Sequence, residues 1–503
     1  MRPRLLLTEP PGFSRGEEEE TKRMLAAADI PSPPLSTPKT LASSAYRQTK
    51  LEEFLSAVEH EFTLSAEKLH RIVDGFLDEL EVGLRQPGIT RNPSFITNRP
   101  DGSETGIYLA IDVGGTNMRV AAVQLLGEGK VNVLQHKHVV SEELKRGKAE
   151  AFIGWIADNT ASLVTEMGEA QETLFMGVVW SFPLNQTDIN KGIIESMGKG
   201  FTVVEDLKGK DLSTILQTAF EDRGLPIKVS AILNDTVGTL VAHAYQCPLT
   251  TMGIIFPTGT NAAYMEKVSN IVKLPSSYKV TDPSSDRMIL NTEWDVYGRP
   301  DYLPMTRYDL ELDTASPIPG FQVYEKMSSG MYLGELCRRI LVDAVQVGRW
   351  LNGHLPAGLD EPFRFKTAFM SEIEADQSED LALTRRLLEE NFQFGALLSL
   401  EDAHLVRWVC QLVGNRSASL LAAAIGSLVR KSEGGGFAPK GEPIVIGMTG
   451  SVWEFYPNFE ERMRYHLAKL FGQEACARVE VGISLDGGLV GAALAAMLGS
   501  RTL

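Results

Sequence analysis

A short pattern occurs twice in this chain of 503 residues: an apolar strand, a tight turn containing Gly-Thr-Asn, and a second apolar strand. The first copy turns at 114–117 and the second at 258–261. A glycine in such a turn tolerates a positive φ, so backbone N–H groups and short polar side chains can converge on an anion such as phosphate. Two related phosphate turns in one chain predict a nucleotide held between two similar halves.

Length and net charge limit the function classes that remain. A chain of 503 residues exceeds what one hydrophobic core usually fills, so we expect two lobes. The formal net charge of -16 would repel nucleic acid or an acidic membrane surface over most of the protein. We therefore expect small-molecule partners and no nucleic acid, and any phosphate must be bound by local geometry.

The cysteines and the apolar runs bear on the compartment. The four cysteines lie far apart and lack CxxC or Cys/His spacing, which is typical of reduced, buried thiols in a cytoplasmic protein rather than of a metal site. We predict no cluster of direct side-chain metal ligands, no signal peptide and no segment long enough to span a membrane. The sequence does not indicate an oligomeric state.

Changes in hydrophobic periodicity divide the chain. Apolar residues recur first at helical spacing, then as short runs alternating with helical segments, and then again in a strongly helical stretch. The alternation indicates an α/β fold with a mixed sheet. The predicted parts are a disordered N-terminal tail at 1–48, N-terminal helices of the large lobe at 49–104, a small α/β lobe at 105–232, the large lobe at 233–482, and a C-terminal helix returning to the small lobe at 483–503.

The first turn carries two charged residues beside its glycines. A carboxylate at Asp112, at the end of an apolar strand, suits a hydrated magnesium ion better than a direct cage, and Arg119 can face a phosphate. Neither a Walker A motif nor a convincing GxGxxG is present, so the other common phosphate-binding folds lose their main support. On turn chemistry alone, each Gly-Thr-Asn turn is more often an ordinary β-hairpin.

An apolar strand ending in Asn234-Asp235-Thr236 precedes a predicted helix. In one interpretation Asp235 or Thr236 caps that helix, an effect of about 1 kcal/mol. In the other, the Asp235 carboxylate faces a cleft and accepts a proton from an attacking hydroxyl group. The two roles are compatible, and these residues alone leave both open.

Four further polar residues suit a sugar pocket, which commonly combines carboxylates and amides with an aromatic wall. Ser181 and Lys199 could bind hydroxyl groups, and Glu293 and Glu325 are acidic candidates. Each of the charged residues taken alone is more often a solvated surface charge or a helix cap.

In content and in order, these motifs resemble the hexokinase family of sugar kinases from residue 51 nearly to the C-terminus. The resemblance implies the actin-like ATPase fold, a duplicated ribonuclease H-like α/β fold of hexokinase type, with two lobes closing on a sugar and ATP. It also implies transfer of the γ-phosphoryl group to the sugar 6-hydroxyl. The matching segments are Asp112 to Arg119, Ser181-Phe182-Pro183, Lys199-Gly200-Phe201, Asn234-Asp235-Thr236, Thr258-Gly259-Thr260-Asn261, Glu293-Trp294, Glu325 to Glu335, and Asp486-Gly487.

The same resemblance implies roles for the matched residues. Asp235 would be the general base, and Lys199 would help to spread the developing charge. Sugar hydroxyls would be held by Ser181, Lys199, Asn234, Asp235, Asn261, Glu293 and Glu325. The nucleotide would be bound by Asp112, Gly114, Gly115, Thr116, Asn117, Arg119, Thr258, Gly259, Thr260, Gly450 and Ser451. ATP would be the cofactor, with Mg²⁺ held mainly through the nucleotide phosphates and water.

The chain also departs from the family pattern. Pro257 stands where a glycine normally opens the second turn, which removes an N–H donor and fixes φ. Thr449 replaces an aspartate before Gly450, and Gly488-Leu489-Val490 replaces Ser-Gly-Lys. These changes concern the nucleotide more than the sugar. They motivate an alternative, a hexokinase-like sugar sensor with a regulatory role and little or no kinase activity.

The segment around 180–212 is more similar to the fungal N-acetylglucosamine kinases of this family. Met197-Gly198 stands where glucose-phosphorylating members usually have Trp-Thr, and an N-acetyl group needs added volume beside the sugar. The resemblance therefore predicts an ATP-dependent 6-kinase with N-acetylglucosamine slightly favoured over glucose.

Overall fold

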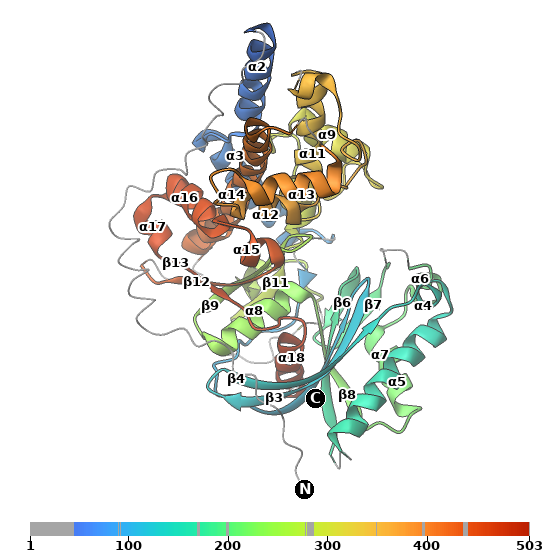
Figure 1. The fold of residues 1–503 in the computed structure, drawn as a ribbon. Coiled ribbons are helices and arrows are strands. Elements are labelled where there is room, and N and C mark those ends of the chain that lie inside the picture. The colour runs from blue at the N-terminus through green and yellow to red at the C-terminus, as the bar shows by residue number, and fades with distance from the viewer. Residues whose placement is uncertain are drawn as a thin grey trace.

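Two lobes, each built on one β-sheet, make up the computed structural model (Figure 1). The structure describes residues 45–503 apart from 89, 91, 169–171, 198–200, 277, 279–285, 349, 395–397, 436–440 and 502. Most of the expected N-terminal tail, and Lys199 with its neighbours Gly198 and Gly200, therefore lie outside the described residues.

The small lobe contains a five-stranded sheet of order β4-β3-β2-β5-β8, in which the first three strands are antiparallel and β5 and β8 run parallel to β2. Its strands are β2 (Thr105–Val113), β3 (Asn117–Gly127), β4 (Lys130–Val139), β5 (Leu174–Trp180) and β8 (Ile227–Leu233). One of the short apolar runs in the alternating part of the sequence, at 174–180, is strand β5. Such runs are typical of parallel strands covered on both faces.

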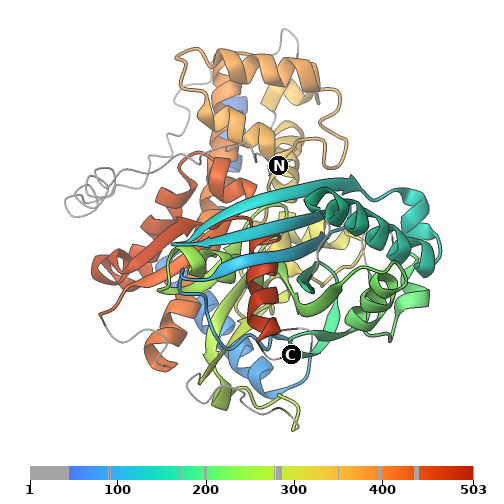
Figure 2. The same cartoon turned by 90° about the horizontal axis from the view of Figure 1, so that it is seen from below.

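Helices cover both faces of this sheet. Successive strand residues face opposite sides of the sheet. Leu109 and Ile111 pack in the core under α5 (Ala149–Met167) and α7 (Leu212–Glu221). Ala110, on the other side, packs in the core that includes α18 (Val490–Ser500). Figure 2 shows the strands side by side with α18 against them. The predicted C-terminal helix is thus α18, and it lies on the small-lobe sheet.

The large lobe contains a six-stranded sheet of order β1-β11-β10-β9-β12-β13. Its strands are β1 (Asn92–Pro93), β9 (Thr250–Ile255), β10 (Asn261–Lys267), β11 (Arg287–Asn291), β12 (Ile444–Thr449) and β13 (Val479–Ile483). Helix α8 (Asp235–Gln246) packs on this sheet and also contacts α18. The two helices approach closely because glycines face each other: a Cβ at Gly491 would overlap the backbone of Gly238. The contact of α8 with α18 therefore joins the two lobes.

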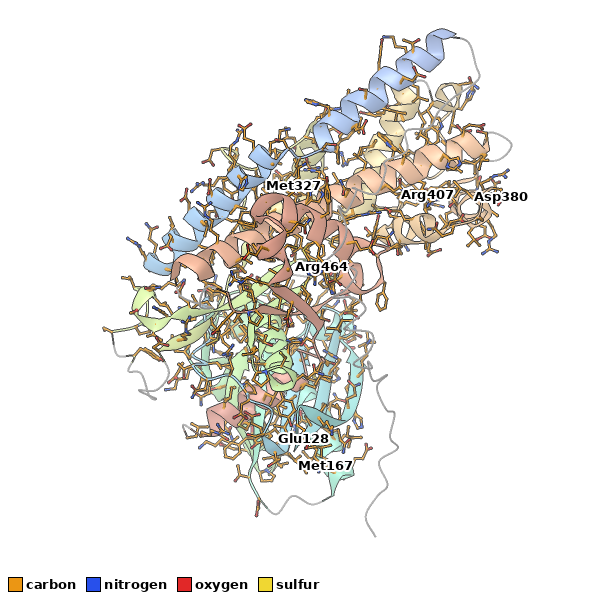
Figure 3. The ribbon with its side chains drawn as sticks, turned by 90° about the vertical axis from the view of Figure 1, so that its left-hand side faces the viewer. Glu128, Met167, Met327, Asp380, Arg407 and Arg464 are labelled. Atoms are coloured by element: carbon orange, nitrogen blue, oxygen red, sulfur yellow. The ribbon has the colours of Figure 1, made fainter. Side chains whose placement is uncertain are left out.

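Helices dominate the rest of the large lobe, around the 36-residue helix α14 (Leu400–Gly435). Met327, labelled in Figure 3 among these helices, is buried and belongs to the packing. The other helices of the lobe are α2 (Ala45–Phe62), α3 (Ala66–Arg85), α9 (Arg307–Thr314), α10 (Val323–Ser328), α11 (Leu333–Gln346), α12 (Thr367–Ala375), α13 (Ala382–Phe392), α15 (Ser451–Phe455), α16 (Phe459–Phe471) and α17 (Gln473–Ala477), with 3₁₀ turns η1 (Val268–Asn270), η2 (Trp294–Val296) and η3 (Trp350–Gly353).

The small lobe also has α4 (Glu142–Arg146), α6 (Val204–Leu207) and the hairpin of β6 (Leu184–Asp188) and β7 (Lys191–Ile194).

Within the described residues, one stretch, 400–431 of α14, is long and apolar enough to cross a membrane, contrary to the expectation that no segment is. However, 94% of its most apolar window is buried inside the protein, as in the core helix of a globular lobe.

Candidate functional site

The first Gly-Thr-Asn turn joins β2 to β3. Strand β2 ends at Val113, β3 begins at Asn117, and the Gly114 N–H donates to the Asn117 carbonyl at 3.0 Å. The predicted strand, turn and strand are confirmed here. Thr116 is exposed, and Gly114, Gly115 and Asn117 are partly exposed, so the turn lies at the protein surface.

Arg119 lies between two carboxylates beside this turn. The register pairs Asp112 directly with Arg119, and Asp112 Oδ2 accepts from Arg119 Nη2 at 2.6 Å and from Nε at 3.1 Å. The guanidinium also bonds both oxygens of Asp486, with Nη2 to Oδ1 at 3.0 Å. Burial alone would lower the pKa of Arg119, but the two carboxylates outweigh it and raise that pKa. The charge expected to face a phosphate is therefore held in place by Asp112 and Asp486.

Gly488 makes this arrangement possible. A Cβ at position 488 would lie 2.5 Å from Arg119 Nη2 and 2.7 Å from Asp112 Oδ2. The glycine that departs from the family pattern thus leaves room for the Asp112–Arg119 pair, and any side chain there would displace it.

The Asn234-Asp235-Thr236 segment lies where β8 ends and α8 begins. Asn234 is the N-cap of α8, and its Oδ1 accepts from the Thr236 N–H at 2.8 Å. The sequence interpretation gave the cap to Asp235 or Thr236, which is wrong because Asp235 is already the first helical residue. The partly exposed Asp235 carboxylate accepts from the Thr236 N–H at 2.9 Å.

Three side chains form an amide–carboxylate cluster next to α8: Asn261, Asn291 and Glu293. Asn261 Nδ2 donates to Asn291 Oδ1 at 2.9 Å and to Glu293 Oε1 at 3.3 Å, and Asn291 Nδ2 donates to the same Glu293 oxygen. Asn291 is not among the site residues predicted from the sequence. Its position two residues before Glu293, at the end of the apolar strand β11, is a signal that could have identified it.

This cluster is close to the start of α8. Thr236 Oγ1 lies 3.4 Å from Asn291 Oδ1, and the negative charge of Asp235 contributes to a raised pKa of Glu293. That pKa is raised well above its ordinary value, first by burial and then by the carboxylate of Asp295. The structure therefore brings Asn234, Asp235, Asn261 and Glu293 together from three separate segments, the β8–α8 junction, the start of β10 and the end of β11.

The second Gly-Thr-Asn turn joins β9 to β10 and is bonded to α10. The Thr260 N–H donates to Glu325 Oε2 at 3.0 Å, and the Trp294 indole N–H donates to Thr260 Oγ1 at 3.0 Å. A Cβ at Gly259 would lie 2.5 Å from Glu325 Oε2. Glu325, expected to hold sugar hydroxyls, thus anchors the second Gly-Thr-Asn turn. Thr258 at the tip of the turn remains exposed.

A third turn follows β12 and packs on the second. Gly450 has φ +135°, and a Cβ there would lie 2.5 Å from the Pro257 nitrogen, so the glycine allows close contact with the Phe256–Pro257 peptide. Glu454 Oε1 accepts from the Gly450 N–H at 2.7 Å and from Thr449 Oγ1 at 3.1 Å. Ser451, at the start of α15, is exposed.

Ser181 is placed beside the first turn. It follows β5, and its N–H donates to the Val113 carbonyl at 3.2 Å. Near it in sequence, Met197 is buried in the small-lobe core, with only 4% of its surface exposed. The predicted role of Lys199 stays a prediction, because that residue lies outside the described residues.

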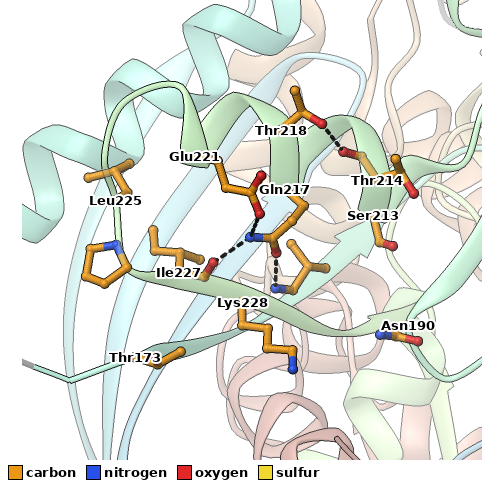
Figure 4. Close-up of a pocket in the computed structure, with 12 residues that line it drawn as sticks. Thr173, Asn190, Ser213, Thr214, Gln217, Thr218, Glu221, Leu225, Ile227 and Lys228 are labelled. Carbon is orange, nitrogen blue, oxygen red and sulfur yellow. Dashed lines mark hydrogen bonds between the residues drawn. The ribbon is translucent and has the colours of Figure 1, made fainter.

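A hollow of about 620 Å³ lies elsewhere, between α7 and β8 on the small lobe (Figure 4). Strand β8 is the edge of its sheet, and the Gln217 amide bridges it, donating to the Ile227 carbonyl at 2.9 Å and accepting from the Val229 N–H at 3.1 Å. The side chain thereby satisfies backbone groups that an edge strand otherwise exposes. We read this hollow as a protected sheet edge, outside the candidate site.

Comparisons with known proteins agree with this geometry. Two family models, both described as hexokinase, match residues 54–245 and 251–498. The chain is 38% identical to hexokinase-1 of Schizosaccharomyces pombe, over 93% of this chain and 95% of the relative, and 34% identical to the glucokinase of Aspergillus niger, over 88% and 96%. The structure is similar to a hexokinase of Schistosoma mansoni complexed with glucose, with TM-score 0.77 and 31% identity over 90% of this chain and 99% of that one.

The fold and the site define a two-lobed α/β phosphotransferase with an alcohol group as acceptor. The actin-like architecture that the sequence implied is confirmed in its hexokinase form. This chain belongs to the hexokinase family. The narrower resemblance to N-acetylglucosamine kinases receives no support from these relatives, which are named as hexokinases and a glucokinase.

Proposed function

We propose that this protein is an ATP-dependent hexose kinase that transfers the γ-phosphoryl group to the 6-hydroxyl of glucose. The observation that carries the proposal is the meeting of Asp235 with the amide–carboxylate cluster of Asn261, Asn291 and Glu293. A carboxylate beside a set of hydrogen-bonding groups can accept the proton of a hydroxyl that those groups hold in position.

In this proposal Asp235 removes the 6-hydroxyl proton, while Asn234, Asn261 and Glu293 orient the other hydroxyls. The residue match adds Ser181, Lys199 and Glu325 to the sugar side. Closure of the lobes about the α8–α18 contact would exclude water, so that the sugar hydroxyl competes with hydrolysis.

The residues around the first turn suit a nucleotide with magnesium. Gly114, Gly115 and Thr116 form a tight surface turn between paired strands, and Asp112 supplies a partly exposed carboxylate for a hydrated ion. When bound, ATP with Mg²⁺ supplies the phosphoryl group and much of the charge neutralisation. Arg119, fixed by Asp112 and Asp486, keeps a positive charge next to the turn.

The proposed sugar preference reverses the expectation from the sequence. Relatives over nearly the whole chain are named hexokinase or glucokinase. Met197, one of the two residues expected to leave room for an N-acetyl group, is packed in the small-lobe core, and the other, Gly198, lies outside the described residues. We therefore place glucose ahead of N-acetylglucosamine as the substrate.

A coupled assay of ADP release tests this function directly. Glucose, fructose, mannose, glucosamine and N-acetylglucosamine are each offered at saturating ATP and Mg²⁺. We expect turnover with glucose and weaker or no turnover with N-acetylglucosamine. A larger kcat/KM for N-acetylglucosamine would overturn the proposed preference.

Replacing the base gives the sharpest test of the chemistry. Asp235→Ala should lower kcat by about 10²–10⁴-fold, the usual contribution of a general base, while glucose binding remains measurable by calorimetry. The matched control is Asp222→Ala, an exposed aspartate at the C-cap of α7. Equal turnover of Asp235→Ala and the control would contradict the role of Asp235.

A second candidate, a sugar sensor with little kinase activity, is favoured by one observation. N–H groups that could bind phosphate are already engaged inside the protein, Thr260 by Glu325 and Gly450 by Glu454. Glucose binding by calorimetry together with no ADP release above background for any sugar would support the sensor and exclude the kinase.

A further inference from the structure

Asp295 is a buried carboxylate that the proposed reaction does not use. Its side chain is 6% exposed, and Oδ2 accepts from Gln322 Nε2 at 2.8 Å. Oδ1, the other oxygen, has no hydrogen-bond partner of good geometry among the residues that the structure describes, although the backbone N–H groups of Asp295 and Val296 interact with the carboxylate and lower its pKa. A buried carboxylate oxygen without a donor is costly, so its surroundings should supply a proton.

The neighbour that can supply it is Glu293. The two carboxyl groups lie within hydrogen-bonding reach of each other across the start of η2. Two carboxylates in a buried site cannot both ionise at little cost, and sharing one proton satisfies the open oxygen of Asp295. Burial raises the pKa of Asp295 as well as that of Glu293, which favours a proton held between them.

Backbone strain points to the same place. Glu293 has φ 48° and Gln322 has φ 54°, both in the left-handed region that non-glycine residues rarely adopt. The side chains of both residues interact with Asp295. Such a conformation costs free energy and persists only where the surrounding contacts hold it in place.

The remaining charges near the pair are already engaged. Glu325 accepts from the Thr260 N–H, Glu79 accepts from the Gly298 N–H, and Lys326 bonds Asp313 at 2.6 Å. Asp235 contributes only further negative charge to Glu293. At the near end of β10, the residue facing the pair is the neutral Asn261.

We propose that Asp295 is a positioning residue of the sugar site, which holds the Glu293 carboxyl group against the hexose through one shared proton. The inference rests on the proposed function, since it assigns Glu293 to the sugar. When the proton is lost, the two carboxylates repel each other and Glu293 leaves its position between Asn261 and Asn291. Sugar binding is therefore coupled to the uptake of that proton.

Calorimetry of glucose binding without nucleotide tests the inference apart from catalysis. In a titration from about pH 6 to 9.5, the Kd of the wild type for glucose should rise with pH, by at most about tenfold per pH unit for the loss of one proton. In Asp295→Asn, which keeps an acceptor for Gln322, Glu293 has no partner carboxylate, and Kd should stay within about threefold over that range. Asp301→Asn, an exposed aspartate of the same segment, is the matched control and should behave as the wild type.

A second measurement needs no variant. Titrations of the wild type near pH 8.5 in buffers of different ionisation enthalpy should reveal uptake of a fraction of a proton on binding glucose. A wild-type Kd that does not change with pH, absence of proton uptake, or the same loss of binding in Asp295→Asn would each overturn the pairing. If the wild type binds no sugar at any pH, the proposed function fails together with it.

Discussion

The two Gly-Thr-Asn turns share their residues but differ in what surrounds them. The first occupies the three residues between β2 and β3 and leaves Thr116 exposed. The second occupies 256–260 between β9 and β10, and its Thr260 and the following Asn261 are buried. The first turn is therefore open to the surface at Thr116, whereas the second is exposed at its tip, Thr258, and buried where it enters β10.

The partners of each turn explain the difference. Beside the first turn, Arg119 bonds Asp112 and Asp486, so two carboxylates hold its guanidinium group in place. At the second, Glu325 and Trp294 bond Thr260, and Asn261 bonds Glu293. The second turn thus contacts the residues proposed to hold the sugar. We infer that the first turn serves the nucleotide alone and that the second links the nucleotide to the sugar.

The largest expected effect comes from the first turn. Arg119→Met removes the positive charge beside the first turn and leaves the carboxylates of Asp112 and Asp486, which would repel a phosphate. The kcat/KM for ATP should therefore fall by about 10²-fold or more. Steady-state kinetics with ATP as the varied substrate measure this change, and glucose Kd should stay within about threefold. Arg146→Met, on the exposed face of α4, is the control. A comparable change in glucose Kd would contradict the separation of the two turns.

The secondary structure could be predicted from the sequence more fully than the side-chain contacts around the two turns. The strand at 174–180 and the break between α2 and α3 follow from apolar periodicity and from the N-cap Ser65, which are local signals. Asn291 and Asp295 were missed because their importance arises from contacts with Asn261 and Gln322, which lie 30 and 27 residues away in sequence. No periodicity within one segment records which segments a sheet will bring together.

An intermediate effect is expected where the second turn meets α10. Glu325→Gln weakens a charged hydrogen bond to the Thr260 N–H, a loss of about 1.5 kcal/mol or more, which corresponds to about tenfold. Because Thr260 also bonds Trp294, next to Glu293, both the KM for ATP and the Kd for glucose should rise. Kinetics and calorimetry measure the two values separately, with Glu311→Gln on α9 as an exposed control. A rise in glucose Kd with an unchanged KM for ATP would mean that Glu325 serves the sugar alone.

The smallest effect is expected at Pro257, the residue that most clearly distinguishes the second turn in sequence. Its nitrogen has no hydrogen and lies against Gly450, so the turn offers one N–H fewer to an anion. Pro257→Gly restores that donor, and the KM for ATP should fall by about twofold to threefold, as expected for a hydrogen bond of about 0.5 kcal/mol. Stability should fall by about 0.4–1 kcal/mol, because glycine gives the unfolded chain more freedom.

The matched control for this change is Pro275→Gly, in an exposed loop of the same lobe. It should lower the unfolding free energy, measured in urea, by a similar amount and leave the KM for ATP unchanged, which separates chain entropy from the restored donor. A higher KM for ATP in Pro257→Gly would show that the contact of the proline ring with Gly450 shapes the nucleotide site more than the missing N–H weakens it. In that case the second turn differs from the first by rigidity, and the loss of one donor is incidental.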